Sequence, residues 1–236
     1  SDSDDNSSEV WEQKSEMLTN WADNFISPSY TTLTNNLVLL EASGNTFAGS
    51  TNQQNLENLR ASFINAYMSW QYVEMFDIGL AEETYYKSKM NIYPTTVSRI
   101  ELNIQNGNTD FNNSNNYAAQ GFPALDYLLY GIENSDELIL SKYINESQYL
   151  SYLSQIINQM LQNTSPIVED WQSYRNTFIS SVENTATSSV NKMTNDFIYY
   201  YEKGFRANKF GIPAGVFSGG ALPEKVEAFY NQNISK

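Results

Sequence analysis

Two carboxylates, Glu74 and Asp77, fall where the sequence pattern favours buried apolar side chains. In the helix predicted there, both project into the same arc as Trp70, because successive residues advance by about 100° around the axis. A buried carboxylate needs a partner, since an unpaired buried charge is costly. Three arrangements would meet this need: an ion pair with Arg99 or Arg206, a bound cation, or a solvated helix end.

A third carboxylate, Asp126, lies within the glycine-bracketed stretch Gly121–Gly131. Pro123 suits the first position of a helix, because its ring fixes φ and its missing N–H is not needed there. Gly131 fits the C-terminal stop of the same helix. Asp126 then lies in or just after the first turn, where the helix dipole favours a negative charge. We expect this carboxylate to share one polar site with the other two, inside or at the mouth of a helical bundle.

Neither histidine nor cysteine occurs in the 236 residues. Their absence excludes a Ser-His-Asp triad, a cysteine nucleophile and zinc sites built from histidine or thiolate. A bound metal would have oxygen ligands alone, which favours a hard cation such as calcium, magnesium or ferric iron. The formal net charge of −14 argues against binding to nucleic acid or to anionic lipid. No apolar run reaches the ~18 residues typical of a membrane span.

Apolar residues recur every three or four positions along most of the chain, and no alternating strand pattern is present. Short connections between such helices favour antiparallel neighbours, so we predict an all-α, up-and-down helical bundle. The second helix is expected to end near Gly44 and the third near Gly79, and a glycine-rich loop is expected over residues 210–220. The predicted helices begin after Ser7 or Ser8, at Ser27, near Thr51, near Val97, at Pro123, before Tyr149, at Ser165 and before Val190.

Several motifs, in order, resemble those of the imelysin peptidase family, and the likeness covers most of residues 50–230. The stretch Gly121–Gly131 resembles the GxHxxE element of that family. Three further matches are Leu59–Ala61 with Trp70 and Val73–Gly79, then Asn91–Pro94 with Ile100 and Glu101, and finally the loop Gly211–Gly215.

The match to GxHxxE is incomplete. Gly121 keeps the glycine, but Pro123 stands at the histidine position and Asp126 at the glutamate position. Proline can neither bind a metal nor transfer a proton, and Asp126 offers a carboxylate on a shorter arm. The resemblance therefore implies the helical fold and the envelope role of the family, whereas its peptidase chemistry is not carried over.

The resemblance implies a bacterial envelope lipoprotein of the iron-regulated branch found in Bacteroidetes, held in the periplasm or at the outer membrane by an N-terminal lipid. We expect a non-catalytic binding component linked to iron or haem acquisition, with iron, haem or an iron-uptake protein as its partner. A cofactor, if one binds, is expected to be an oxygen-ligated cation, iron or calcium. The expected site residues are Trp70, Glu74, Asp77, Tyr93, Arg99, Gly121, Pro123, Asp126, Tyr127 and Arg206.

Two alternatives remain open. A metal-dependent peptidase of the family would use carboxylates alone, or histidines from a missing half. A surface glycan- or peptide-binding helical protein is suggested by the 17 tyrosines, some of which must be exposed.

Three segments are expected along the chain. Residues 1–9 are polar and acidic and are predicted to be disordered, like the spacer behind the lipid anchor of a lipoprotein. Residues 10–220 should form the imelysin-like bundle. Residues 221–236 should begin a second helical half that is cut short, because chains of the family usually continue further.

Overall fold

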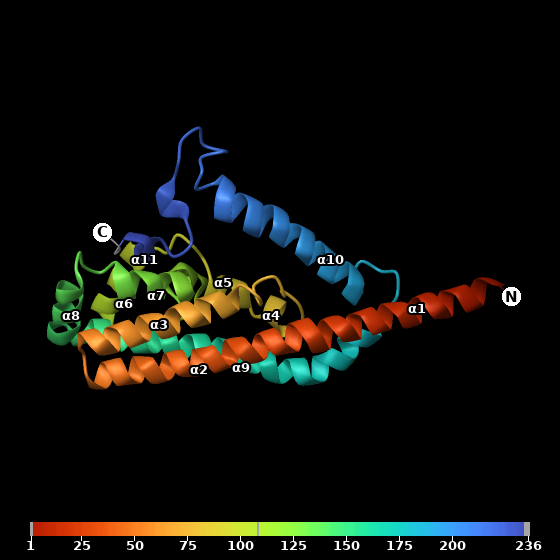
Figure 1. Cartoon of the computed structure of the whole chain (residues 1–236), viewed down its shortest axis with the longest axis horizontal. Helices are drawn as coiled ribbons and strands as arrows, with labels where there is room; N and C mark the ends of the chain where they lie inside the picture. Colours follow the sequence, from red (N-terminus) through yellow and green to blue (C-terminus); the bar gives the residue numbers. More distant parts are fainter. Residues whose placement is uncertain (1, 108, 234–236) are drawn as a thin grey trace.

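The computed structural model describes residues 2–107 and 109–233 of the chain. Within these residues the structure is helical and contains no strand. Three long helices, α2 (Ser27–Gly49), α3 (Gln53–Trp70) and α9 (Ser147–Ser180), lie side by side as the base of the molecule (Figure 1). The predicted all-α, up-and-down bundle is confirmed.

The helix α2 runs five residues beyond the stop expected at Gly44 and ends at Gly49. Gly44 instead allows a close approach between helices. A Cβ atom added there would lie 2.8 Å from Cδ1 of Ile157 on α9, closer than real Cβ contacts. Tight packing of α2 on α9 therefore explains this glycine better than a helix end does.

The first helix, α1 (Asp2–Trp21), already includes residues 2–9, where disorder was expected. The chain then passes through the π-helical segment η1 (Ala22–Ile26) into α2. The N–H of Ser27 bonds to the carbonyl of Ala22, so the wider turn carries the helix across Pro28 without a break.

One helix, α9, spans the region where two were predicted. Pro166 lies inside it and does not end it. The hydroxyl of Ser165 bonds to the carbonyl of Leu161, and that of Thr164 to the carbonyl of Met160. Packing of α9 on α2 outweighs the tendency of proline to break a helix, and the two hydroxyl bonds leave the helical backbone on either side continuous.

A second layer of short helices covers this base. Its centre is α7 (Gly121–Tyr130), in which every residue is buried and which contacts both the base and most of the short helices around it. The surrounding elements are α4 (Leu80–Glu83), α5 (Tyr86–Met90), α6 (Val97–Asn106), the 3₁₀ turn η2 (Ser114–Ala119) and α8 (Asp136–Asn145).

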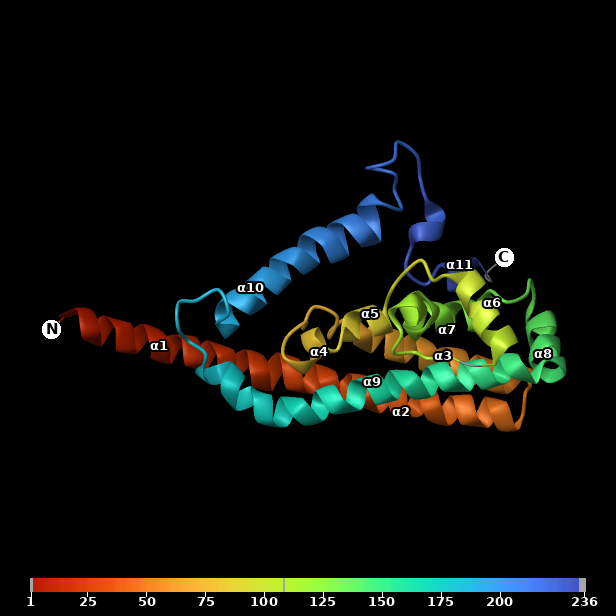
Figure 2. The same ribbon diagram turned by 180° about the vertical axis from the view of Figure 1, so that it is seen from behind.

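The last part of the chain forms an arm and a return. The arm consists of α10 (Ser189–Tyr199) and the π-helical segment η3 (Tyr200–Gly211), which rises away from the bundle (Figures 1 and 2). The predicted loop thus begins only after Gly211. The chain then returns through η4 (Pro223–Lys225) to α11 (Phe229–Asn233), which packs on α7. No helix in the described residues combines the length and apolar character that crossing a bilayer requires.

Candidate functional site

The backbone around Gly121 fixes where α7 begins. Its φ is +74°, and an added Cβ would lie 2.2 Å from the carbonyl oxygen of Met90. Only glycine fits both the conformation and this contact, which brings the end of α5 against the start of α7. The helix begins at Gly121, two residues before the expected position, and Pro123 lies in the first turn, where no N–H is needed. The stop at Gly131 is confirmed, with its N–H 2.7 Å from the carbonyl of Tyr127.

Asp126 does not interact with the N-terminal backbone N–H groups of its own helix. The first turn of α7 contains no acidic residue, and the side chain is turned toward α11 instead. Its Oδ2 accepts the backbone N–H of Tyr230 at 2.7 Å, and its Oδ1 accepts that of Asn231 at 3.0 Å. Asp126 is 2% exposed. Burial raises its pKa to about 6, against the opposing effect of the two amide hydrogen bonds.

Glu74 lies beyond the end of α3, which stops at Trp70 instead of near Gly79. Its N–H still bonds to the carbonyl of Trp70 at 2.9 Å, so one further turn keeps it on the inner face. Glu74 is 5% exposed, which rules out a solvated helix end for this carboxylate. Its Oε1 accepts a hydrogen bond from Nδ2 of Asn91 at 2.8 Å.

Glu74 belongs to a group of polar side chains from four parts of the chain, which we call the Glu74 cluster. Asn91 is its centre: Oδ1 accepts the hydroxyl of Tyr67 at 2.7 Å, and Nδ2 donates to Oε1 of Glu227 at 2.9 Å as well as to Glu74. Oε1 of Glu227 also accepts from Nε2 of Gln71 at 3.1 Å. The members of the cluster are Tyr67, Gln71, Glu74, Asn91, Lys209 and Glu227.

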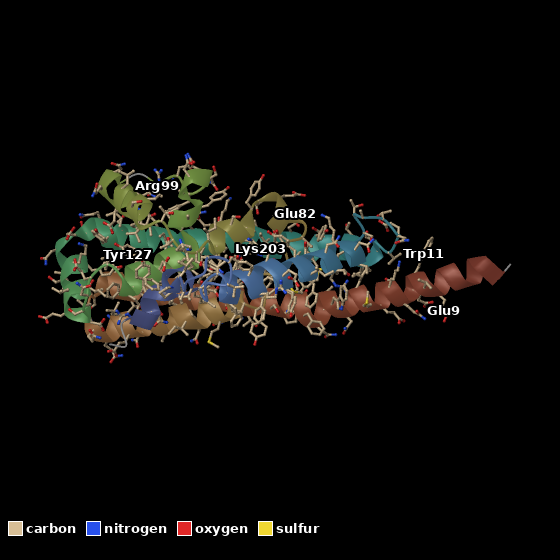
Figure 3. All side chains as sticks on the ribbon, turned by 90° about the horizontal axis from the view of Figure 1, so that it is seen from above. Glu9, Trp11, Glu82, Arg99, Tyr127 and Lys203 are labelled. Carbon is tan, nitrogen blue, oxygen red and sulfur yellow. The ribbon has the colours of Figure 1, made fainter. Side chains whose placement is uncertain are left out.

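The cation of the Glu74 cluster is Lys209, so of the three arrangements left open for Glu74 the ion pair with Arg99 or Arg206 is not formed. Its Nζ lies 3.1 Å from Oε2 of Glu227 and 3.5 Å from Oε2 of Glu74. The side chain of Arg206 is 67% exposed and pairs with Glu202 on its own helical segment. Arg99 lies on α6 (Figure 3) and forms no ion pair in the part of the chain that the structure describes.

Burial and charge together set the protonation of the cluster. Burial acts to lower the pKa of Lys209, but the carboxylates of Glu74 and Glu227 outweigh it, and the pKa is raised. Burial and then Glu227 raise the pKa of Tyr67 well above its usual value. Burial, Glu227 and Glu74 raise the pKa of Tyr93 in the same way. Near neutral pH the ammonium is therefore charged and both phenols keep their protons.

Two neighbouring cavities flank Tyr93. The larger, of about 300 Å³, is lined by Glu74, Asp77, Asn91 and Tyr93 and by residues of α5 and η3. The smaller, of about 220 Å³, is lined by Tyr93, Pro123 and Asp126 and by the returning chain before α11. The structure therefore brings Glu74, Asp77, Tyr93, Pro123 and Asp126 to neighbouring positions, but it divides them between two cavities.

Asp77 is half-buried and faces a different set of charges from Glu74. Burial raises its pKa, with Lys87 opposing and Glu82 adding to the shift. On α10, burial, Asp77 and Glu82 raise the pKa of Asp196 to about 6. Lys192 bonds to Glu82 at 2.8 Å and offsets part of this negative charge. Glu82 and Lys203, both labelled in Figure 3, line the larger cavity.

Two further expected site residues, Trp70 and Tyr127, pack against the walls of this region. Trp70 is buried, and its ring meets Tyr86 edge-on at 5.4 Å between centroids. Tyr127 donates its hydroxyl to Glu101 at 2.7 Å, and its ring packs edge-on against Tyr230 at 5.1 Å. These contacts make Trp70 and Tyr127 packing residues, of which Tyr127 holds α11 in place.

The expected oxygen-ligated cation does not fit the carboxylates as they stand. Both oxygens of Asp126 accept backbone N–H groups, and Glu74 is already paired with Asn91 and Lys209. Over the described ranges, no three acidic side chains converge in a way that could hold a metal ion. We derive no chemistry through a metal from this arrangement.

Sequence reasoning missed Gln71, Lys209 and Glu227 as site residues. Tyr67 lay on the predicted apolar stripe, and Asn91 opened one of the quoted motifs, so both had a local signal. Lys209 and Glu227 had none, because 138 residues separate Gln71 from Lys209 and 136 separate Asn91 from Glu227. Only the return of the chain brings them to the cluster.

Comparisons with known proteins agree with this fold. The family model described as Imelysin matches residues 26–234. An imelysin-like protein from Psychrobacter arcticum 273-4 superposes with a TM-score of 0.73 at 19% identity, over 94% of this chain and 70% of that one. A candidate iron-regulated protein A precursor from Parabacteroides distasonis ATCC 8503 superposes with a TM-score of 0.72 at 14% identity, over 94% and 69%. The search of curated proteins gave no match.

Proposed function

This chain belongs to the imelysin family, and from that premise we propose that it is a non-catalytic binding component of the bacterial cell envelope, linked to iron or haem acquisition. The proposal includes export and attachment by an N-terminal lipid. One structural neighbour carries the name of an iron-regulated protein precursor. That name supports both the link to iron and the export of the chain.

The observation that carries the proposal is the state of the motif carboxylate. Asp126 accepts two backbone N–H groups, and the residue three positions before it is Pro123. A peptidase needs an acid–base group or a metal-bound water at this position. Here the carboxylate holds α11, and the position of the motif histidine carries no titratable group. Beside it lie two cavities lined by both polar and apolar side chains, which suit the binding of a ligand.

Two measurements test the proposal. In the first, the protein is incubated with insulin chains, with and without a chelator, and products are followed by mass spectrometry. We expect no cleavage, and chelator-sensitive cleavage would overturn the non-catalytic assignment in favour of a metal-dependent peptidase of the family.

The second measurement is calorimetric titration with ferric citrate, calcium chloride and haemin. We expect one of the iron ligands to bind and Asp126→Ala to weaken it. Asp196→Asn is the matched control, because it removes another partly buried acid whose pKa is raised to about 6, outside the motif. If no ligand binds, or if Asp126→Ala binds as tightly as Asp196→Asn, the link of the motif region to iron is wrong.

A specific observation favours a second candidate, the glycan-binding protein. Tyr72, Tyr85, Tyr199 and Tyr201 are exposed, and Tyr85 and Tyr199 line the larger cavity. Exposed aromatic rings beside polar groups suit sugar recognition. Retention on a glycan array that is lost in Tyr85→Ala and Tyr199→Ala but kept in Tyr72→Ala would favour this function over iron binding.

A further inference from the structure

The arm forms one wall of the larger cavity. It supplies Tyr199, Lys203 and Asn208 to the lining, whereas Asp77 and the other lining residues outside the arm come from the bundle. The arm is joined to α9 by residues 181–188, a connection that contains no helix. A change in how closely α10 packs on the bundle would therefore widen or close this cavity.

The inner face of α10 carries Asp196 toward the bundle. From residue 193 to residue 200, Met193, Asp196 and Tyr200 are buried or half-buried at spacings of three and four, and the residues between them are exposed. Oδ2 of Asp196 is buried and has no hydrogen-bond partner. An ionised carboxylate loses the hydration of this oxygen and gains no contact that replaces it. The packed arm therefore favours the protonated acid.

Charged groups from three parts of the bundle and from α10 itself act on Asp196. Asp77 in the turn after α3 and Glu82 on α4 oppose its ionisation. Lys87 on α5 and Lys192 on α10 favour it, but Lys192 is bound to Glu82 at 2.8 Å and Lys87 lies over a tyrosine ring of η3. Within the described residues neither Asp77 nor Asp196 forms an ion pair. Three carboxylates thus face two ammonium groups, and one proton balances the charge.

Burial and these charges decide when the proton leaves. Burial, then Asp77 and Glu82, raise the pKa of Asp196 to about 6. Burial also raises the pKa of Asp77. On α9, Tyr174 acts on Lys192 but stays uncharged, because burial raises the pKa of this phenol too. Asp196 therefore changes its charge between mildly acidic and neutral pH.

We propose that the arm is a proton-controlled wall of the larger cavity: protonated Asp196 lets α10 pack on the bundle, and ionised Asp196 beside Asp77 drives α10 outward. When α10 moves out, the carboxylate regains water and its pKa returns toward 3.8. The packed arrangement thus binds more protons than the released one, so its share falls as the pH rises from about 4 to about 6. This inference does not depend on the proposed link to iron.

The position of the arm can be measured directly. The chain contains no cysteine, so two introduced cysteines, Asn195→Cys on α10 and Asn35→Cys on α2, take spin labels at exposed positions alone. Double electron–electron resonance then gives the distances between the labels at pH 4.5 and at pH 7.5. We expect the ratio of packed to released arms to fall about ten-fold, less than the full pKa difference allows, because solvent screens the half-buried acid. A distance distribution that does not change with pH would overturn the proposal.

Two variants in the labelled chain identify the group that titrates. Asp196→Asn keeps the shape of the side chain without its charge, so the arm should stay packed at pH 7.5 as it does at pH 4.5. Asp77→Asn removes the facing charge and should reduce the shift. If the full shift persists in Asp196→Asn, another group controls the arm and the proposal is wrong.

The matched control is Glu202→Gln. Glu202 lies on the same arm and forms an exposed pair with Arg206, so the change removes one carboxylate away from Asp77 and Asp196. We expect this variant to keep the ten-fold shift of the labelled chain. If it loses the shift as completely as Asp196→Asn does, the net charge of the arm and not the buried acid sets its position, which contradicts the proposal.

Discussion

The motif helix α7 and the arm formed by α10 and η3 meet the same polar region in opposite ways. Every residue of α7 is buried, and its position is fixed by contacts on all sides. The arm leaves large apolar side chains in solvent, with Phe197 55% and Tyr199 63% exposed. Yet Lys209, which belongs to the arm, is the one positively charged member of the Glu74 cluster within the described residues. The rigid helix α7 thus places Asp126, whereas the loosely packed arm supplies the cation that balances Glu74 and Glu227.

Disrupting the packing of α7 should have the largest effect on the free energy of unfolding. Gly121→Ala places a Cβ 2.2 Å from the backbone oxygen of Met90 at a positive φ, so we expect a loss of about 3 kcal/mol or more in the free energy of unfolding, measured by urea denaturation. The matched control is Gly107→Ala, which also has a positive φ but no atom within 4 Å of the added Cβ. It should cost only about 1 kcal/mol. Equal losses would show that backbone conformation, and not the contact between α5 and α7, sets the effect.

The ion pair between the arm and Glu74 should give the next largest effect. Lys209→Met leaves the buried carboxylate of Glu74 without its cation, and we expect a loss of about 3 kcal/mol at neutral pH by thermal or urea unfolding. Arg206→Met, on the same segment, breaks only an exposed pair with Glu202 and should change the stability little. A small loss for Lys209→Met would show that the arm does not stabilise the bundle through this side chain.

The pH dependence of stability distinguishes the buried Asp126 of α7 from the partly buried Asp196 of the arm. The folded chain holds the proton of Asp126 up to a pKa of about 6, whereas the unfolded chain releases it near 3.8. The folded state binds more protons in this interval, so stability is highest below it, falls as the pH rises from about 4 to about 6, and is level above. The fall should amount to about 3 kcal/mol, because each unit of difference between the two pKa values corresponds to about 1.4 kcal/mol.

Asp126→Asn should remove that fall, as measured by urea midpoints between pH 4 and pH 7. Asp196 on the arm contributes a similar but smaller fall, because solvent screens its partly buried carboxyl group. Asp196→Asn should therefore flatten the curve less than Asp126→Asn does. If Asp196→Asn flattened the curve more than Asp126→Asn, the acid that burial perturbs more strongly would be Asp196 and not Asp126.

The smallest effect is expected from the exposed apolar side chains of the arm. Phe197 lines a groove of about 360 Å³ between η1 and α10, together with Trp21, Phe25 and Met193. Phe197→Ser should change the free energy of unfolding by less than about 0.5 kcal/mol, because the ring is largely in solvent already. It should lower the binding of a hydrophobic dye. By contrast, Phe122→Ala in α7 should cost about 4 kcal/mol.

Local sequence patterns predicted the parts of the molecule that depend on near neighbours. The stop at Gly131 and the short helix after Val97 follow from residues within a few positions of each other, and the structure contains both. The patterns failed where distant packing decides. Pro166 stays inside α9, and Gly44 stays inside α2, because contacts between these long helices outweigh the local preference.

The candidate site divides in the same way. Asp126 and Glu74 were predicted from their own segments, since a carboxylate on an apolar face is visible in the sequence. Their partners were not. The amides of Tyr230 and Asn231, and the ammonium of Lys209, reach them only because the chain folds back after the arm. No spacing within one helix could have indicated these pairs.

The continuous helical run from Asp2 to Gly49 has a mechanical consequence. At 1.5 Å per residue it is a strut of roughly 70 Å, interrupted by no loop and widened only at η1. Its first part projects beyond the bundle (Figure 2). Whatever holds the chain at that projecting tip would keep the Glu74 cluster at a set distance and orientation, as a spacer does and a flexible tether does not.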